Sequence, residues 1–119
     1  MSKIRILIVE PNKEPRQMKI EHTLENLQNI VDGIIEYVEL DNHTDIICNE
    51  EGKILNMELN RRLGNDIIAG TFIIAGQNYG ETISLSRKQI KQYKEMFRLS
   101  KHKVIEYIKT KIKSNCIVI

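Results

Sequence analysis

Two kinds of hydrophobic pattern alternate along the N-terminal third of the chain. The stretch KIRILIVEP holds a run of mostly β-branched residues that stops at Pro11, which predicts a buried strand ending in a turn. Pro15 is then placed as an early helical residue, where a missing N–H costs nothing. Apolar residues recur at helical spacing over residues 20–31, and Gly33 offers a left-handed stop. We therefore expect one amphipathic helix packed on the first strand.

Short apolar segments separated by turn residues predict strands in the middle of the chain. These segments are IIEYVEL, DIIC, KILNM, residues 66–75 and the short ISL stretch. Between DIIC and KILNM, Gly52 is placed to take the positive φ that closes a hairpin. Gly70, inside the fourth segment, indicates a bulge or a close approach by another backbone or a ligand. About five strands with hairpin links predict a mainly antiparallel sheet in an α+β fold.

The pattern after the last predicted strand indicates a long basic C-terminal helix. Ser86 stands three residues before Gln89, which is a capping-box signature for a helix start. Ile90, Tyr93 and Phe97 then form an apolar stripe. An adjacent face of the same helix carries the cations Lys91, Lys94, Arg98 and Lys101. The stripe continues in a shifted phase beyond residue 99, so we expect a kink there.

The length of 119 residues suits one hydrophobic core. We predict a single α+β domain over residues 1–98 and a basic helical extension of that domain over residues 99–119. The apolar runs are far shorter than the roughly 20 residues of a membrane span, and we expect a cytoplasmic protein without a cleavable leader. Residues 87–113 hold ten Lys/Arg against two Glu, a local balance of +8; because the whole chain carries +2, the remainder carries −6.

Patterns typical of catalysis or metal binding are weak in this chain. The three histidines lack a second ligand at i+3 or i+4, and Cys48 and Cys116 have neither zinc-like nor disulfide-framework spacing. No Ser-His-Asp arrangement, P-loop or dinucleotide fingerprint can be assembled. Glu50 and Glu51 are adjacent in a turn, which suits a solvated tip better than an acid/base pair. We expect a non-enzymatic protein with no metal site and no cofactor.

The pair Arg61-Arg62, preceded by Asn60, is the most informative polar motif. Arginine forks bind phosphate and carboxylate groups bidentately, and two of them on an irregular segment beside a sheet can form an anion pocket. The alternative is that one or both arginines pair with the acidic residues of the body.

The predicted basic helix favours a different kind of partner. Its cations could follow the phosphates of a nucleic acid or contact a host protein. Trp is absent, and Tyr93 and Phe97 belong to the apolar stripe, so no aromatic platform for bases is expected. The alternative is a solvated face, or docking of the helix on the acidic body.

Six motifs occur together and in order: ILIVEPNKEP, TLENLQNIVDG, IICNEEGK, LNRRL, DIIAGTFIIAG and SRKQIKQYKEMF. With them, residues 3–98 resemble a family of small uncharacterised proteins, defined by a domain of unknown function, from phages, plasmids and other mobile elements of Gram-positive bacteria. The family pattern has Gly where this chain has Asn12, and commonly a double glycine where it has Asp32-Gly33; Asn and Asp tolerate such turns. The resemblance implies an accessory protein acting in a bacterial cytoplasm, and it transfers no catalytic residues.

By analogy with small phage proteins that bind without catalysis, we expect sequestration of a small anionic, nucleotide-like ligand in a counter-defence role. The expected ligand-binding residues lie in loops or at strand ends, where a rigid sheet presents binding groups. They are Lys13, Asn49, Asn60, Arg61, Arg62, Gly70 and Thr71. The alternative is an inhibitor or regulator that binds a host protein or nucleic acid through Lys91, Lys94, Arg98 and Lys101. We expect a homo-oligomer, because such pockets frequently form between subunits.

Overall fold

The computed structural model describes residues 3–99 and contains eight strands and two helices. The strands are β1 (Lys3–Val9), β2 (Arg16–Glu21), β3 (Ile35–Asp41), β4 (Thr44–Asn49), β5 (Leu59–Leu63), β6 (Asp66–Ala69), β7 (Phe72–Asn78) and β8 (Glu81–Ile83). The helices are α1 (Leu24–Val31) and α2 (Arg87–Met96). The main sheet has six strands in the order β2-β1-β7-β4-β3, with β8 also paired to β7, and β5 and β6 form a separate hairpin. Every pairing is antiparallel, so the predicted α+β class with a mainly antiparallel sheet is confirmed.

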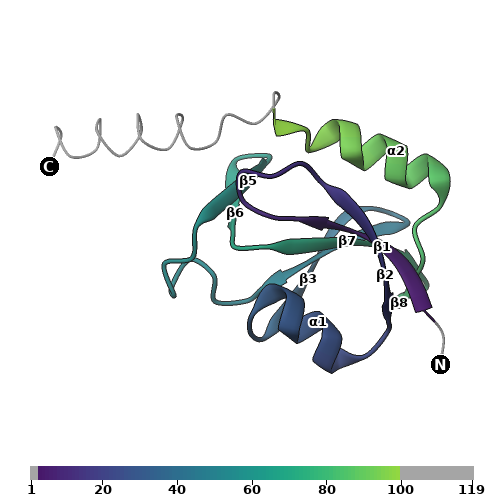
Figure 1. Cartoon of the computed structure of the whole chain (residues 1–119), viewed down its shortest axis with the longest axis horizontal. Helices are drawn as coiled ribbons and strands as arrows, with labels where there is room; N and C mark the ends of the chain where they lie inside the picture. The colour runs from purple at the N-terminus through teal and green to yellow at the C-terminus, as the bar shows by residue number, and fades with distance from the viewer. Residues whose placement is uncertain (1–2, 100–119) are drawn as a thin grey trace, which may run out of the picture.

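The two helices lie on opposite faces of the main sheet (Figure 1). Successive side chains of a strand point to opposite faces, so the apolar run of β1 supplies both. Ile4, Ile6 and Ile8 pack in the cluster that includes α1, whereas Leu7 and Val9 pack in the cluster that includes α2. Burial on both faces explains why this strand is a continuous apolar run.

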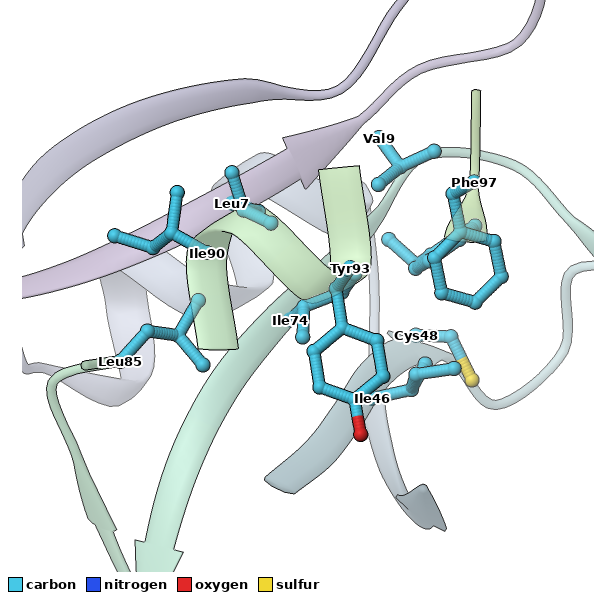
Figure 2. Packing of buried hydrophobic residues seen from close by; sticks show 10 residues of the cluster. Leu7, Val9, Ile46, Cys48, Ile74, Leu85, Ile90, Tyr93 and Phe97 are labelled. Carbon is cyan, nitrogen blue, oxygen red and sulfur yellow. The ribbon is translucent and has the colours of Figure 1, made fainter. Parts of the chain in front are cut away.

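The core beneath α2 is built around two aromatic residues, Tyr93 in the helix and Phe97 at its C-cap. Figure 2 shows Tyr93 and Phe97 among aliphatic side chains of β1, β4 and β7. The rings of Phe97 and Phe72 meet edge to face, with centroids 5.5 Å apart and an interplanar angle of 74°. Since Tyr93 and Phe97 are each only 1% exposed, they fix how α2 lies across the sheet.

The prediction of a helix directly after the first strand, starting near Pro15, is wrong in its placement. Residues Arg16–Glu21 form β2, which pairs with β1 in a register that sets Ile20 opposite Ile4. The helix begins only at Leu24, where the Thr23 hydroxyl accepts a hydrogen bond from the Asn26 N–H at 3.1 Å. Strand pairing across the sheet outweighed the helical spacing, which the strand residue Ile20 satisfied by coincidence.

Two predicted strands also differ from the structure. The segment KILNM forms a turn, so β4 is followed by β5 and not by the expected hairpin partner. The predicted strand over residues 66–75 is divided into β6 and β7 by Gly70, whose φ of 85° suits glycine. That left-handed residue carries the chain from the small hairpin into the main sheet.

The capping box predicted at the start of the last helix is confirmed. The Ser86 hydroxyl accepts from the Gln89 N–H, and the Gln89 side chain accepts from the Ser86 N–H. The helix α2 ends at Met96, with Phe97 as its C-cap. The predicted helical continuation beyond residue 99, with Lys101, lies outside the described residues.

Candidate anion-binding site

Arg61, the centre of the predicted anion pocket, lies in the interior and is 0% exposed. Its guanidinium donates from Nε to the Phe97 carbonyl at 2.9 Å and from Nη2 to the Lys13 carbonyl at 2.6 Å. Nη1 donates to the Glu10 carbonyl at 3.4 Å and to Asn60 Oδ1 at 2.8 Å. Burial lowers the pKa of Arg61, and the nearby Glu14 carboxylate partly offsets this shift. Arg61 therefore joins the end of α2 to the β1–β2 turn and does not face solvent.

The remaining predicted ligand-binding residues do not converge on one surface. The buried Asn60 donates to the carbonyls of Val9 and Gly70, and the buried Asn49 donates to the carbonyls of Val31 and Asp32 at the end of α1. Three others are at least partly accessible and lie in three different segments: Lys13, Arg62 and Thr71. Gly70 is buried, and its N–H donates to the Glu58 carbonyl at 2.7 Å. The two asparagines and Gly70 thus satisfy backbone groups of the fold.

A different group of residues forms a basic groove between α2 and the β1–β2 hairpin. The groove has a volume of about 580 Å³. Its lining residues are Arg5, Gln17, Lys19, Arg87, Ile90, Lys91 and Lys94. We call this feature the cationic groove, because five of the seven lining residues are Lys or Arg and none is acidic.

Strand register and helix periodicity bring these cations together. Arg5 of β1 lies directly opposite Lys19 of β2, so their side chains occupy the same face of the sheet. On α2, Arg87, Lys91 and Lys94 share one flank, since residues three and four apart are neighbours on a helix. Like charges that face one another across a strand pair are destabilising, which indicates that an anion in the groove would relieve repulsion.

Within residues 3–99, no carboxylate forms an ion pair with a cation of the groove. Arg5 donates from Nη1 to the Leu85 carbonyl at 3.2 Å, a neutral acceptor. Among residues 3–99, the ion pairs with carboxylates involve other cations: Lys13, Arg16, Lys53 and Arg98. Lys19, Arg87, Lys91 and Lys94 are exposed. In the part of the chain that the structure describes, the groove therefore presents positive charge that no ion pair compensates.

An adjoining cavity extends the positive surface along α2. It has a volume of about 410 Å³ and is lined by Glu14, Pro15, Lys91, Lys94, Glu95 and Arg98. Two acidic residues enter here, and Arg98 pairs with Glu95 at 3.3 Å. The lining of the adjoining cavity is consequently less positively charged than the lining of the cationic groove.

Sequence reasoning found two of the five cations of the cationic groove. It selected Lys91 and Lys94 as partner-binding residues, together with Arg98 and Lys101. It missed Arg5, Lys19 and Arg87. For the first two, the reason is that residue 19 was expected in a helix and that no local signal indicates the pairing of β2 with β1. Alternation of charged and apolar residues in RQMKIE is the one signal that favours a half-exposed strand there.

Other kinds of site are not evident in residues 3–99. This part of the chain contains no cluster of three or more His, Cys, Asp or Glu residues that could hold a metal ion. It also contains no helix with the length and apolar character needed to cross a membrane. Cys48 is a buried thiol whose pKa burial and the Glu36 carboxylate raise to about 11, so it is not an activated nucleophile.

Comparison with known proteins places the chain at the level of its family. No curated protein and no solved structure matches the chain significantly. One family model, described as Domain of unknown function (DUF3846), matches residues 4–98. Because the match spans most of the 119 residues, the chain belongs to the DUF3846 family.

Proposed function

We propose that this protein is a non-enzymatic binding protein that sequesters a small anionic ligand carrying phosphate groups. The observation that carries the proposal is the cationic groove, where five Lys and Arg side chains line one cavity without a lining carboxylate. Its volume of about 580 Å³ falls within the usual range for small-ligand sites. The proposed ligand is nucleotide-like, and it is held by α2 and the β1–β2 hairpin.

Phosphate suits the mixture of cations in the groove better than a carboxylate does. Lysine ammonium groups act as mobile point charges, while the guanidinium groups of Arg5 and Arg87 present forks that match two oxygens of one phosphate. A ligand with two or three phosphates can contact several cations at once. Each contact adds favourable energy and removes part of the repulsion between Arg5 and Lys19.

The setting we propose is that of an accessory protein from a phage or another mobile element, acting in counter-defence within a bacterial cytoplasm. A protein that holds a nucleotide signal away from its receptor needs affinity and abundance, and it needs no catalytic group. The proposal includes a homo-oligomer, in which neighbouring subunits would enclose the open side of the groove. Native mass spectrometry of protein purified from bacterial cells measures both the subunit number and the mass of any retained ligand.

The direct test is a calorimetric titration with inorganic triphosphate and with nucleoside triphosphates. Lys91→Glu should weaken binding at least tenfold, because Lys91 lines the cationic groove. Lys88→Glu is the matched control: it makes the same charge change on the same exposed helix surface, and Lys88 lines neither the groove nor the adjoining cavity. If the two variants weakened binding equally, the loss would follow from the change in net charge alone. That result would refute a defined binding site in the groove.

Binding of nucleic acid along α2 is the second candidate. Lys91 and Lys94 line both the groove and the adjoining cavity, and Arg98 lines the adjoining cavity. These cations form a row along α2 that is longer than a small ligand needs. If this candidate holds, affinity should rise with oligonucleotide length and fall steeply with salt, with a log–log slope of about −0.7 for each neutralised phosphate of a single strand. Saturation by a mononucleotide at equal affinity would exclude it.

A further inference from the structure

A second cavity lies on the other flank of α2, with a volume of about 540 Å³. It is lined by Asp41, Asn42, His43, Gln77, Asn78, Ile83, Ser86, Gln89 and Gln92. We call it the amide cavity, since five of its nine lining residues are Asn or Gln. At about 100° per residue, Gln89 and Gln92 lie on the side of the helix away from Arg87 and Lys91. The amide cavity is therefore separate from the cationic groove.

The walls of the amide cavity are held by hydrogen bonds between segments distant in sequence. Gln89 of α2 donates from Nε2 to the His43 carbonyl at 2.9 Å and to the Thr44 hydroxyl at 2.7 Å. Gln77 of β7 donates to the Asn42 carbonyl at 2.9 Å. The Tyr93 hydroxyl donates to the Asp41 carboxylate, and burial together with this bond raises the pKa of Tyr93 to about 12. These contacts fix the β3–β4 turn and β7 against α2.

Several polar side chains of the cavity remain available to a ligand. The side-chain amides of Asn42, Asn78 and Gln92 and the imidazole of His43 form no hydrogen bond with any group of residues 3–99. All four residues are exposed. Each amide offers a donor and an acceptor close together, a pairing that matches the edge of a planar heterocycle. The Asp41 carboxylate, in contrast, already accepts hydrogen bonds from the His43 N–H and the Tyr93 hydroxyl.

An exposed aromatic residue follows one of the cavity-lining residues in the chain. Tyr79 follows the lining residue Asn78 and is 100% exposed at the tip of the β7–β8 hairpin. Its φ of 51° is left-handed, as is the φ of 81° at Gly80. Two-residue hairpin turns with positive φ at both positions favour Asn-Gly, and a bulky residue at the first position is unusual. A solvated aromatic ring in a strained backbone conformation indicates a role outside the fold.

We infer that the amide cavity binds a nucleobase. Asn42, Asn78 and Gln92 would pair with the polar edge of the base, Ile83 would contact its apolar face, and Tyr79 would supply a stacking surface. This site requires no phosphate and stands independently of the cationic groove. The two features come closest in sequence at the start of α2, where the consecutive residues Ser86 and Arg87 line one each.

Uncharged nucleosides are the probes that test this inference, because they cannot occupy the cationic groove through charge. In two-dimensional NMR spectra of the full chain, one or more of adenosine, guanosine, cytidine and uridine should shift the resonances of Asn42, Asn78 and Gln92. Affinities for the four nucleosides should differ at least tenfold between the best and the worst. Free ribose is the control, and shifts from ribose equal to those from nucleosides would overturn the assignment to a base.

Three variants separate the cavity from the fold and from the groove. Tyr79→Asn should weaken nucleoside binding while raising the denaturation midpoint, since Asn tolerates the left-handed conformation. Gln92→Ala should weaken the binding about tenfold, and Lys91→Glu should leave it unchanged. Loss of nucleoside binding in Lys91→Glu, or absence of shifts at the amide cavity with every nucleoside, would refute the inference. If the protein bound triphosphate but no nucleoside, the nucleobase site would be refuted and the proposed function would stand. If it bound a nucleoside but no triphosphate, only the proposed function would be refuted.

Discussion

Replacement of Arg61 by Met is expected to be among the most destabilising single changes in this protein. The methionine keeps a side chain of similar length in the core but removes every donor of the guanidinium. The carbonyl oxygens of Phe97, Glu10 and Lys13 and the Asn60 Oδ1 atom then lose a partner in a region where Arg61 itself is fully buried. Unsatisfied buried acceptors make the folded state less favourable relative to the unfolded chain.

The expected loss is about 3–5 kcal/mol. A hydrogen bond with a charged donor contributes roughly 1.5–3 kcal/mol, and Arg61 makes four. The simple sum overstates the effect, because the variant no longer has to desolvate a buried cation, and some freed carbonyls will reach water. Against a total stability of about 5–15 kcal/mol for a small domain, the remaining loss is a large fraction.

Guanidinium chloride unfolding followed by far-ultraviolet circular dichroism measures this loss. With an m-value of about 4 kcal/mol/M, the midpoint of the Arg61→Met variant should fall by about 1 M. Arg62→Met is the matched control: Arg62 is the exposed neighbour on β5, and its replacement should cost less than about 1 kcal/mol. Arg61→Lys should fall between the two, since an ammonium keeps the charge but not the planar fork.

Free energies of unfolding for Arg61→Met and Arg62→Met that agree within about 0.5 kcal/mol would refute a structural role for Arg61. If Arg61→Met kept its stability but lost triphosphate binding, Arg61 would instead belong to a ligand site, as its sequence context suggested. Loss of both properties agrees with the structure, because Arg61 holds the end of α2, and α2 carries three cations of the groove.

Three other changes test separate parts of the structure. Tyr79→Asn should stabilise the protein by about 1 kcal/mol in thermal unfolding, because it relieves a left-handed tyrosine. Lys19→Gln should stabilise the ligand-free protein by roughly 0.2–1 kcal/mol at low salt by removing its repulsion with Arg5, and the gain should vanish at 1 M salt. Raising the pH through the range from 9 to 12 should destabilise the fold, since the pKa values of the buried Cys48 and Tyr93 are raised to about 11 and about 12. The folded state favours the neutral forms of both groups. Their contribution to stability is therefore complete below the unfolded pKa values and is lost as each group ionises. In Cys48→Ala, denaturation curves should show the loss of stability beginning at a higher pH.

Local signals in the sequence were sufficient for some elements and insufficient for others. The capping box of Ser86 and Gln89 is a short-range motif, and it located the start of α2 correctly. The strand β2 could not be located in this way, because it depends on pairing with β1, and the same residues also fit a helical spacing. Gly70 was predicted to mark a bulge or a close approach. Its position between the β5–β6 hairpin and the main sheet is visible only in the three-dimensional structure.

The candidate site shows the same division between local and long-range information. The chemistry of Arg61 suggested an anion, but its actual acceptors come from residues 36 to 51 positions away and from the neighbouring Asn60. Positive charge on α2 was visible in the sequence as a helical stripe. Its completion into a groove required Arg5 and Lys19, which only the strand register brings beside the helix.

The position of α2 is the feature on which both proposed sites depend. Its N-terminal turn is attached to the β3–β4 turn through Gln89, its middle is anchored by Tyr93 in the core, and its C-terminal carbonyl at Phe97 binds Arg61. One flank of this fixed helix presents cations and the other presents amides. A displacement of α2 must therefore change both sites together, whereas substitutions on a single flank must change one. Lys91→Glu should weaken triphosphate binding alone, and Gln92→Ala should weaken nucleoside binding alone. Arg61→Met should weaken both. These three results together would demonstrate that arrangement.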